Sequence, residues 1–147
     1  MGNRYVHEVA FGLAFDLGTA MSDGARALEL DLTAVQMRTL RAVSHGPLAM
    51  GEVASVLKRD PAQVTRLVAD LVARDLLVRT RNPADGRSYL LSLSPDGARV
   101  FQRIRTLEEE MQGVMLRGIS EKDLGTFVAV AERLMENLAE MDGGAVD

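Results

Sequence analysis

The sequence has no cysteine among its 147 residues. This absence excludes disulfide bonds, thiolate zinc sites, thiol redox sensing and cysteine nucleophiles. No stretch approaches the roughly 18 apolar residues that a membrane-spanning helix needs. Glu8 and Asp16 bracket the short apolar run near the N-terminus, so no secretion signal is expected. We therefore expect a soluble, cytoplasmic protein with no membrane partner.

Recognisable catalytic patterns are also missing from the sequence. It contains no glycine-rich phosphate loop, no nucleophile elbow, and no histidine–carboxylate cluster with metal-ligand spacing. The three consecutive glutamates from Glu108 to Glu110 are better explained as a solvated helix face than as acid–base catalysts. The sequence therefore predicts no enzyme, no catalytic residue, no metal and no cofactor.

Positive charge is scarce overall but concentrated in one segment. The net charge is −4, which argues against a generally basic nucleic-acid coat protein. A site-specific binder remains compatible with it, because cations are needed only where phosphates lie. Within residues 58–87, seven cationic and four acidic side chains give a local net charge of +3. A basic patch on an acidic protein needs a functional explanation.

The basic segment begins as an amphipathic helix. Asp60 can cap its N-terminus, and Pro61 suits the first helical position. Apolar side chains recur at helical spacing and would bury one face, namely Val64, Leu67, Val68 and Leu71. Polar side chains are left for the other faces, namely Gln63, Thr65, Arg66 and Arg74.

Other helices are expected on both sides of this one. An apolar helix spans about residues 4–21 and ends or is interrupted at residues 22–24. A second spans 33–44, with Thr33 and Gln36 as a capping box, and a third spans 50–57. The short connection to the basic helix predicts a helix-turn-helix.

The second half of the chain predicts a β-hairpin followed by two long helices. Strands over residues 77–80 and 88–93 flank a charged turn, Ser94 caps the next helix, and Ser120 begins the last one. The fold class is therefore mainly α with a small β-hairpin wing: a winged helix-turn-helix with terminal helices for dimerisation. We expect one compact domain with dimerisation helices at 1–28 and 95–147 around a DNA-binding region at 29–94.

Motifs in this order resemble the MarR family (multiple antibiotic resistance regulators). The residues that carry the resemblance are L-x-x-x-Q at Leu32 and Gln36, Gly46-Pro47-Leu48, Val64 to Val68, Asp85-Gly86-Arg87 and Leu93 to Gly97. The resemblance covers about residues 30–100 by motif and the whole chain by layout. This sequence departs from the family pattern at Ala62-Gln63, Asp75 and Gly86, which suggests its own operator preference.

The resemblance implies a homodimeric transcription regulator, most simply a repressor, that binds pseudo-palindromic double-stranded DNA. Release by a small lipophilic or phenolic effector is implied as well. The effector pocket would involve the first, second and fifth helices, where the candidates are Phe11, Phe15, Met37, Arg41 and Arg99. An alternative is a winged helix used for protein–protein contact, with its basic patch facing an acidic partner.

The DNA contacts can be assigned by position. Gln63, Thr65 and Arg66 lie on the early turns of the basic helix, from which helix-turn-helix proteins generally read bases. Candidates for phosphate contact are Lys58, Arg59 and Arg81. Arg87 would act from the wing, with Asp85 orienting it or tying the loop. The alternative for Arg66 is a solvated charge or an ion pair with Asp70, one helical turn away.

Overall fold

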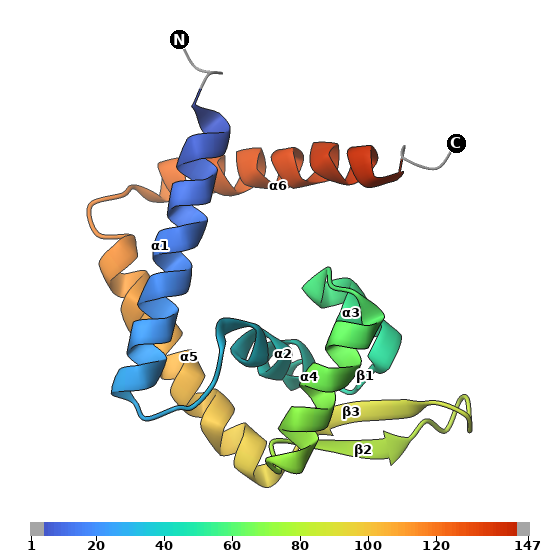
Figure 1. Cartoon of the computed structure of the whole chain (residues 1–147). Coiled ribbons are helices and arrows are strands. Elements are labelled where there is room, and N and C mark those ends of the chain that lie inside the picture. The colour runs from blue at the N-terminus through green and yellow to red at the C-terminus, as the bar shows by residue number, and fades with distance from the viewer. Residues whose placement is uncertain (1–4, 144–147) are drawn as a thin grey trace. The chain divides into compact units, whose positions relative to one another are not determined.

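The computed structural model describes residues 5–143. It contains six helices and a three-stranded antiparallel sheet over those residues (Figure 1). The chain divides after Met111 into two units, each described by itself. This boundary does not test the functional regions 1–28, 29–94 and 95–147, which stay predictions. No helix among the described residues is long and apolar enough to cross a membrane.

Helix α1 (Val6–Ala27) is longer than expected. The predicted interruption at residues 22–24 is wrong, because all three residues lie within α1. Asp23 pairs with Arg26 at 3.0 Å. A Cβ atom on Gly24 would overlap the side chain of Leu107, so the glycine allows α1 to pack closely against that residue. The turn-like composition therefore marks a helix contact instead of a helix end.

Helices α2 (Ala34–Ser44) and α3 (Met50–Leu57) confirm the predicted positions. Thr33 and Gln36 form the expected capping box, with the Gln36 side chain accepting the Thr33 N–H at 2.8 Å. Helix α3 begins after Ala49, which has no capping side chain, but the Glu52 carboxylate accepts the Ala49 N–H at 2.7 Å. This reciprocal bond satisfies a donor that an alanine side chain cannot.

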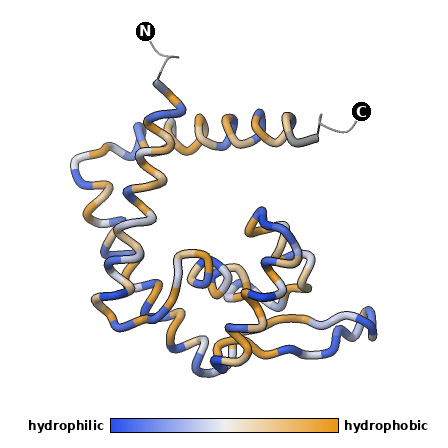
Figure 2. Tube along the Cα trace, viewed as in Figure 1, coloured by the Kyte–Doolittle hydropathy of each residue, from blue (hydrophilic) through white to orange (hydrophobic). Residues whose placement is uncertain are grey.

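The sheet combines the expected hairpin with one strand that the sequence did not predict. Strands β2 (Leu77–Arg81) and β3 (Tyr89–Leu93) form the wing, and β1 (Leu48–Ala49) pairs with the other side of β3. The order is β1-β3-β2. Two residues are too few for periodicity to reveal β1. The wing tip beyond β2 is hydrophilic (Figure 2).

A single apolar core holds α4 (Pro61–Ala73) between the other helices and the sheet. The fully buried large side chains are Leu40, Val53, Val64, Val68, Leu71, Leu77, Leu91 and Ile104. Three of them are on α4, as the apolar spacing of that helix predicted. Since α4 presents one face to this core, its opposite face is directed outward.

A polar junction joins the end of α4 and the start of β2 to the end of β3 and the start of α5 (Pro95–Met115). The main-chain N–H of Ser94 donates to the Leu76 carbonyl at 3.1 Å. The Ser94 hydroxyl donates to the Asp75 carbonyl and accepts the Gly97 N–H at 2.8 Å. Asp75 has a φ of 57°, a left-handed conformation that aspartate tolerates better than most other non-glycine residues.

Residue 97 must be glycine for this junction to close. A Cβ atom there would overlap the carbonyl oxygen of Leu76, which is backbone and has no rotamer to change. The Leu76 side chain is itself buried, with 8% of its surface exposed. The glycine therefore permits the close approach of α5 to the turn that follows α4.

The second unit is dominated by α6 (Glu121–Gly143). Ser120 accepts the Asp123 N–H at 3.2 Å, which confirms the predicted start. Large apolar side chains of this helix are exposed within the chain, including Phe127 at 55% and Leu138 at 61%.

We predict that Gly97→Ala lowers the free energy of unfolding by about 1–3 kcal/mol, because the added methyl group overpacks a site bounded by backbone. Urea denaturation of the purified protein measures the change. Gly86→Ala is the matched control, since nothing lies within 4 Å of a Cβ at that position, and it should change stability by less than about 0.5 kcal/mol. Equal effects of the two substitutions would contradict the junction geometry.

Candidate nucleic-acid interface

Helix α4 is fixed at its N-terminus by the residues that precede and open it. The Asp60 carboxylate accepts the N–H groups of Ala62 at 2.8 Å and Gln63 at 3.3 Å. Pro61 occupies the first turn, where it has no N–H to leave unsatisfied. The early turns, which carry the predicted base-reading residues, are therefore well ordered by local hydrogen bonds.

The predicted base-reading side chains all lie on the exposed side of α4. Gln63, Thr65 and Arg66 are exposed, whereas Val64 and Val68 are fully buried. The Thr65 hydroxyl donates to the Pro61 carbonyl at 2.8 Å, which leaves its oxygen free to accept a further hydrogen bond. The helix thus presents a donor-and-acceptor amide, a hydroxyl oxygen and a guanidinium on its exposed side.

The ion pair with Asp70, one of the two alternatives for Arg66, is not the arrangement observed. The Asp70 carboxylate accepts a hydrogen bond from Gln36 Nε2 at 2.7 Å and lies 3.7 Å from Arg74 Nη1. Within residues 5–143, Asp70 forms an ion pair with Arg74 and not with Arg66. The Arg66 guanidinium is therefore available on the outer face of α4.

The wing loop is organised by its own polar side chains. Asp85 accepts the main-chain N–H of Arg87 at 3.1 Å, and Asn82 accepts that of Ala84 at 3.0 Å. Asn82 also donates to the Ser88 hydroxyl at 3.1 Å. Asp85 thus ties the loop through the backbone, and the Arg87 side chain is exposed.

The three candidates for phosphate contact are all exposed, but they lie on different elements. Lys58 ends α3 with a φ of 50°, and Arg59 follows with its N–H bonded to the Ala54 carbonyl at 3.2 Å. Arg81 closes β2 opposite Tyr89 of β3. The left-handed turn at Lys58 was not predicted, because lysine carries no sequence signal for that conformation.

Arg79 is a cation near this surface that received no role from the sequence. It pairs with Leu91 across the sheet and, with Tyr89, lines a hollow of about 280 Å³ beside Met50 at the start of α3. In a strand, residues two apart share a face. The alternation of side chains along β2 could therefore have predicted that Arg79 lies on the same face of the wing as Arg81.

The effector candidates do not gather around one cavity. Met37 is buried in the core, and Arg99 pairs with Asp96 on an exposed turn of α5. Phe11 and Phe15 are each 74% exposed on α1. The fifth candidate, Arg41, is described next. None of these side chains lines the hollow beside Met50, and the effector pocket stays a prediction.

Arg41 belongs to a polar contact between α2 and α5. Its Nε donates to Glu108 Oε1 at 3.1 Å, and its guanidinium carbon lies 5.8 Å from the ring centroid of Phe101. The Glu108 side chain is 24% exposed. The expectation that all three glutamates form a solvated face is therefore wrong for Glu108, whose partner lies 67 positions away in the sequence.

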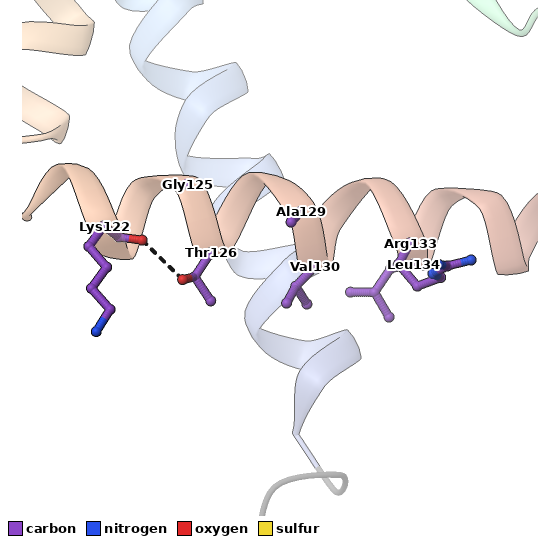
Figure 3. A pocket seen from close by; sticks show the side chains of 7 residues that line it. All are labelled: Lys122, Gly125, Thr126, Ala129, Val130, Arg133 and Leu134. Carbon is purple, nitrogen blue, oxygen red and sulfur yellow. Dashed lines mark hydrogen bonds between the residues drawn. The ribbon is translucent and has the colours of Figure 1, made fainter.

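A second hollow lies along α6 and is formed by one helix face (Figure 3). Its lining residues are Lys122, Gly125, Thr126, Ala129, Val130, Arg133 and Leu134. They recur at intervals of three and four, which is the spacing of a single helical stripe. Such a stripe is a surface for packing and lacks converging polar groups that would define a chemical site.

Comparison with known proteins agrees with the geometry. A sequence profile described as MarR family matches residues 30–88. Multiple antibiotic resistance protein MarR of Salmonella typhimurium is 33% identical over 108 residues, which are 72% of this chain and 75% of that protein. A putative transcriptional regulatory protein for the hcr operon of Thauera aromatica is 24% identical over 102 residues, which cover 69% of this chain and 61% of that protein's length.

A solved structure shares the fold. BpsR of Bordetella bronchiseptica aligns with a TM-score of 0.70 and 22% identity, covering 92% of this chain and 98% of that chain. For that protein, regulation of DNA binding by 6-hydroxynicotinic acid is described. With the winged helix-turn-helix, the motif order and these relatives in agreement, this chain belongs to the MarR family of DNA-binding transcriptional regulators.

Proposed function

We propose that this MarR-family regulator is a homodimeric repressor that binds a pseudo-palindromic operator and releases it when a small lipophilic or phenolic ligand binds. The observation that carries the DNA-binding surface is the two-sided character of α4. Val64, Val68 and Leu71 are buried, and Gln63 and Arg66 are exposed on the helix that the family uses for recognition.

The exposed side chains match the chemistry of base edges and phosphates. A glutamine amide can bond adenine through two atoms, and an arginine guanidinium can bond guanine in the same way. Gln63 and Arg66 therefore act in the major groove, beside Thr65. The wing places Arg87 against phosphate or an adjacent minor groove. Lys58, Arg59 and Arg81 contact phosphates, which position the protein without reading sequence.

The dimer is supported by apolar side chains that the single chain leaves uncovered. On α1, Phe11 and Phe15 are each 74% exposed; on α6, Met135 is 52% and Leu138 is 61% exposed. Exposed apolar surface of this extent marks an interaction site in a folded protein. A symmetric dimer that buries these faces would carry two copies of α4, as a pseudo-palindromic operator requires.

The effector proposal rests on the contact between α2 and α5. Arg41 offers a cation beside the ring of Phe101, and its partner is the carboxylate of Glu108. An aromatic acid could stack near Phe101 and compete with Glu108 for the guanidinium. The regulation of BpsR by 6-hydroxynicotinic acid, an aromatic acid with a ring hydroxyl group, supports this class of ligand.

We predict that combining Arg66→Ala with Arg87→Ala weakens operator binding at least tenfold, because each guanidinium contributes about 1–3 kcal/mol of DNA contact. A gel-shift titration with DNA from upstream of the gene measures the dissociation constant. Arg26→Ala removes an exposed arginine of α1 as a matched control and should stay within about twofold. Unchanged affinity of the double variant at physiological salt would refute the assigned surface and favour a protein–protein module.

The two classes of contact should separate in their response to salt. Lys58→Ala should weaken binding to all duplexes alike and reduce the slope of log K against log salt by about 1 per protomer. Gln63→Ala should leave that slope unchanged while reducing discrimination between the operator and a base-substituted duplex. Fluorescence anisotropy over a series of salt concentrations measures the salt slope and the discrimination between duplexes. If Lys58 read bases and Gln63 contacted phosphate, the two variants would exchange these results.

The dimer makes a further prediction for α1. Phe15→Glu places a charge in the proposed interface, so we expect sedimentation equilibrium to show a shift towards monomer, together with loss of operator binding. Glu8→Gln is the control on the same helix and should leave the dimer intact. A Phe15→Glu protein that remained dimeric would exclude this part of α1 from the interface.

A further inference from the structure

Asp70 is an acidic residue on the exposed side of the recognition helix, one turn after Arg66. Side chains four apart on a helix are neighbours, and opposite charges at that spacing attract each other. A free Asp70 would therefore draw the Arg66 guanidinium along the helix and away from a base edge. Its carboxylate would also face the phosphates of bound DNA. The structure shows that Asp70 is held by other partners.

The first partner is Gln36 of α2, whose orientation is fixed by its role as a cap. Its Oε1 accepts the Thr33 N–H at 2.8 Å, and its main-chain N–H donates to the Thr33 hydroxyl at 3.3 Å. The amide oxygen is thereby occupied, which directs Nε2 outward. That nitrogen donates to Asp70 Oδ2 at 2.7 Å.

The second partner is Arg74, which is anchored outside α4 in the same way. Its Nη2 donates to the Asp31 carbonyl at 2.5 Å, and its Nη1 lies 3.7 Å from Asp70 Oδ2. Asp31 and Thr33 belong to the loop that joins α1 to α2. Both groups that engage Asp70 Oδ2 are therefore held by this loop, and Arg74 lies one turn beyond Asp70, at the opposite end from Arg66.

We propose that Gln36 and Arg74 are positioning residues for DNA recognition, which hold the Asp70 carboxylate away from Arg66 and leave that guanidinium free to bind a base. The inference rests on the proposed DNA contact of Arg66. It gives the glutamine of the L-x-x-x-Q motif a second role beyond capping α2. The loop between α1 and α2, which holds both positioning residues, thereby helps to set the charge of the recognition surface.

The size of the effect follows from the pair that would form. A helical pair at this spacing is weak and changes the fraction of free arginine by a factor of about two. Because a dimer presents two recognition helices, the loss of operator affinity should be about fourfold. The loss of operator affinity should be specific to the base that Arg66 contacts.

Gln36→Glu tests the proposal while keeping the cap, since glutamate accepts the Thr33 N–H as well as glutamine does. The substitution removes the donor to Asp70 and places a second carboxylate against it. We expect about fourfold weaker binding to a duplex selected from random DNA by the wild-type protein. Thermal unfolding, followed by circular dichroism, verifies that the variant is folded.

Two further variants distinguish a positioning role of Gln36 from a general loss of DNA binding. Combining Gln36→Glu with Asp70→Asn reverses the direction of the hydrogen bond, because the introduced amide donates to the introduced carboxylate. This double variant should restore affinity to within about twofold of wild type. In an Arg66→Ala background, Gln36→Glu should have no effect, since the guanidinium to be protected is gone.

The outcomes distinguish this inference from the proposed function. If Arg66→Ala alone leaves affinity and base preference unchanged, the proposed DNA contact of Arg66 is wrong. If Arg66→Ala weakens binding but Gln36→Glu acts equally in both backgrounds, Gln36 does not work through Arg66. Failure of Asp70→Asn to restore binding in a folded protein would likewise overturn the positioning role.

Discussion

The recognition surface depends on the close approach of Gly97 to the Leu76 carbonyl. At this junction the turn after α4, both ends of the wing and the start of α5 meet within a few residues, joined by the Ser94 hydroxyl and main chain. The recognition helix and the wing are thereby fixed to the same long helix. In the proposed mode of DNA binding, this connection sets the spacing at which Arg66 on α4 and Arg87 on the wing contact one duplex.

Charge is distributed so that an acidic chain can bind a polyanion at one place. The net charge of the chain is −4, yet residues 58–87 carry +3. Three of the four acidic side chains within that segment have structural partners: Asp60 caps α4, Asp85 ties the wing loop, and Asp70 is held by Gln36 and Arg74. Carboxylates in the basic segment therefore support the cations, instead of pairing with Arg66 or Arg87.

The local chemistry of the sequence predicted most of the fold, because caps and apolar spacing act over one or two turns. Asp60, Thr33 and Ser94 begin helices where expected. The errors arise from contacts between distant segments. The sequence around Gly24 predicted a helix end, but in the structure Leu107 packs against this glycine. Glu108 was predicted to be solvated, but it accepts a hydrogen bond from Arg41. For the same reason the exposed face of α4 was predictable, whereas the partners of Asp70 were not.

In the proposed dimer, two copies of the α4 and wing surface read one duplex. This arrangement can be tested by selecting binding sites from random double-stranded DNA with the purified protein. Such a dimer should enrich an inverted repeat whose half-site centres lie about one helical turn apart. Enrichment of a single, non-repeated half-site, or no enrichment at all, would contradict it.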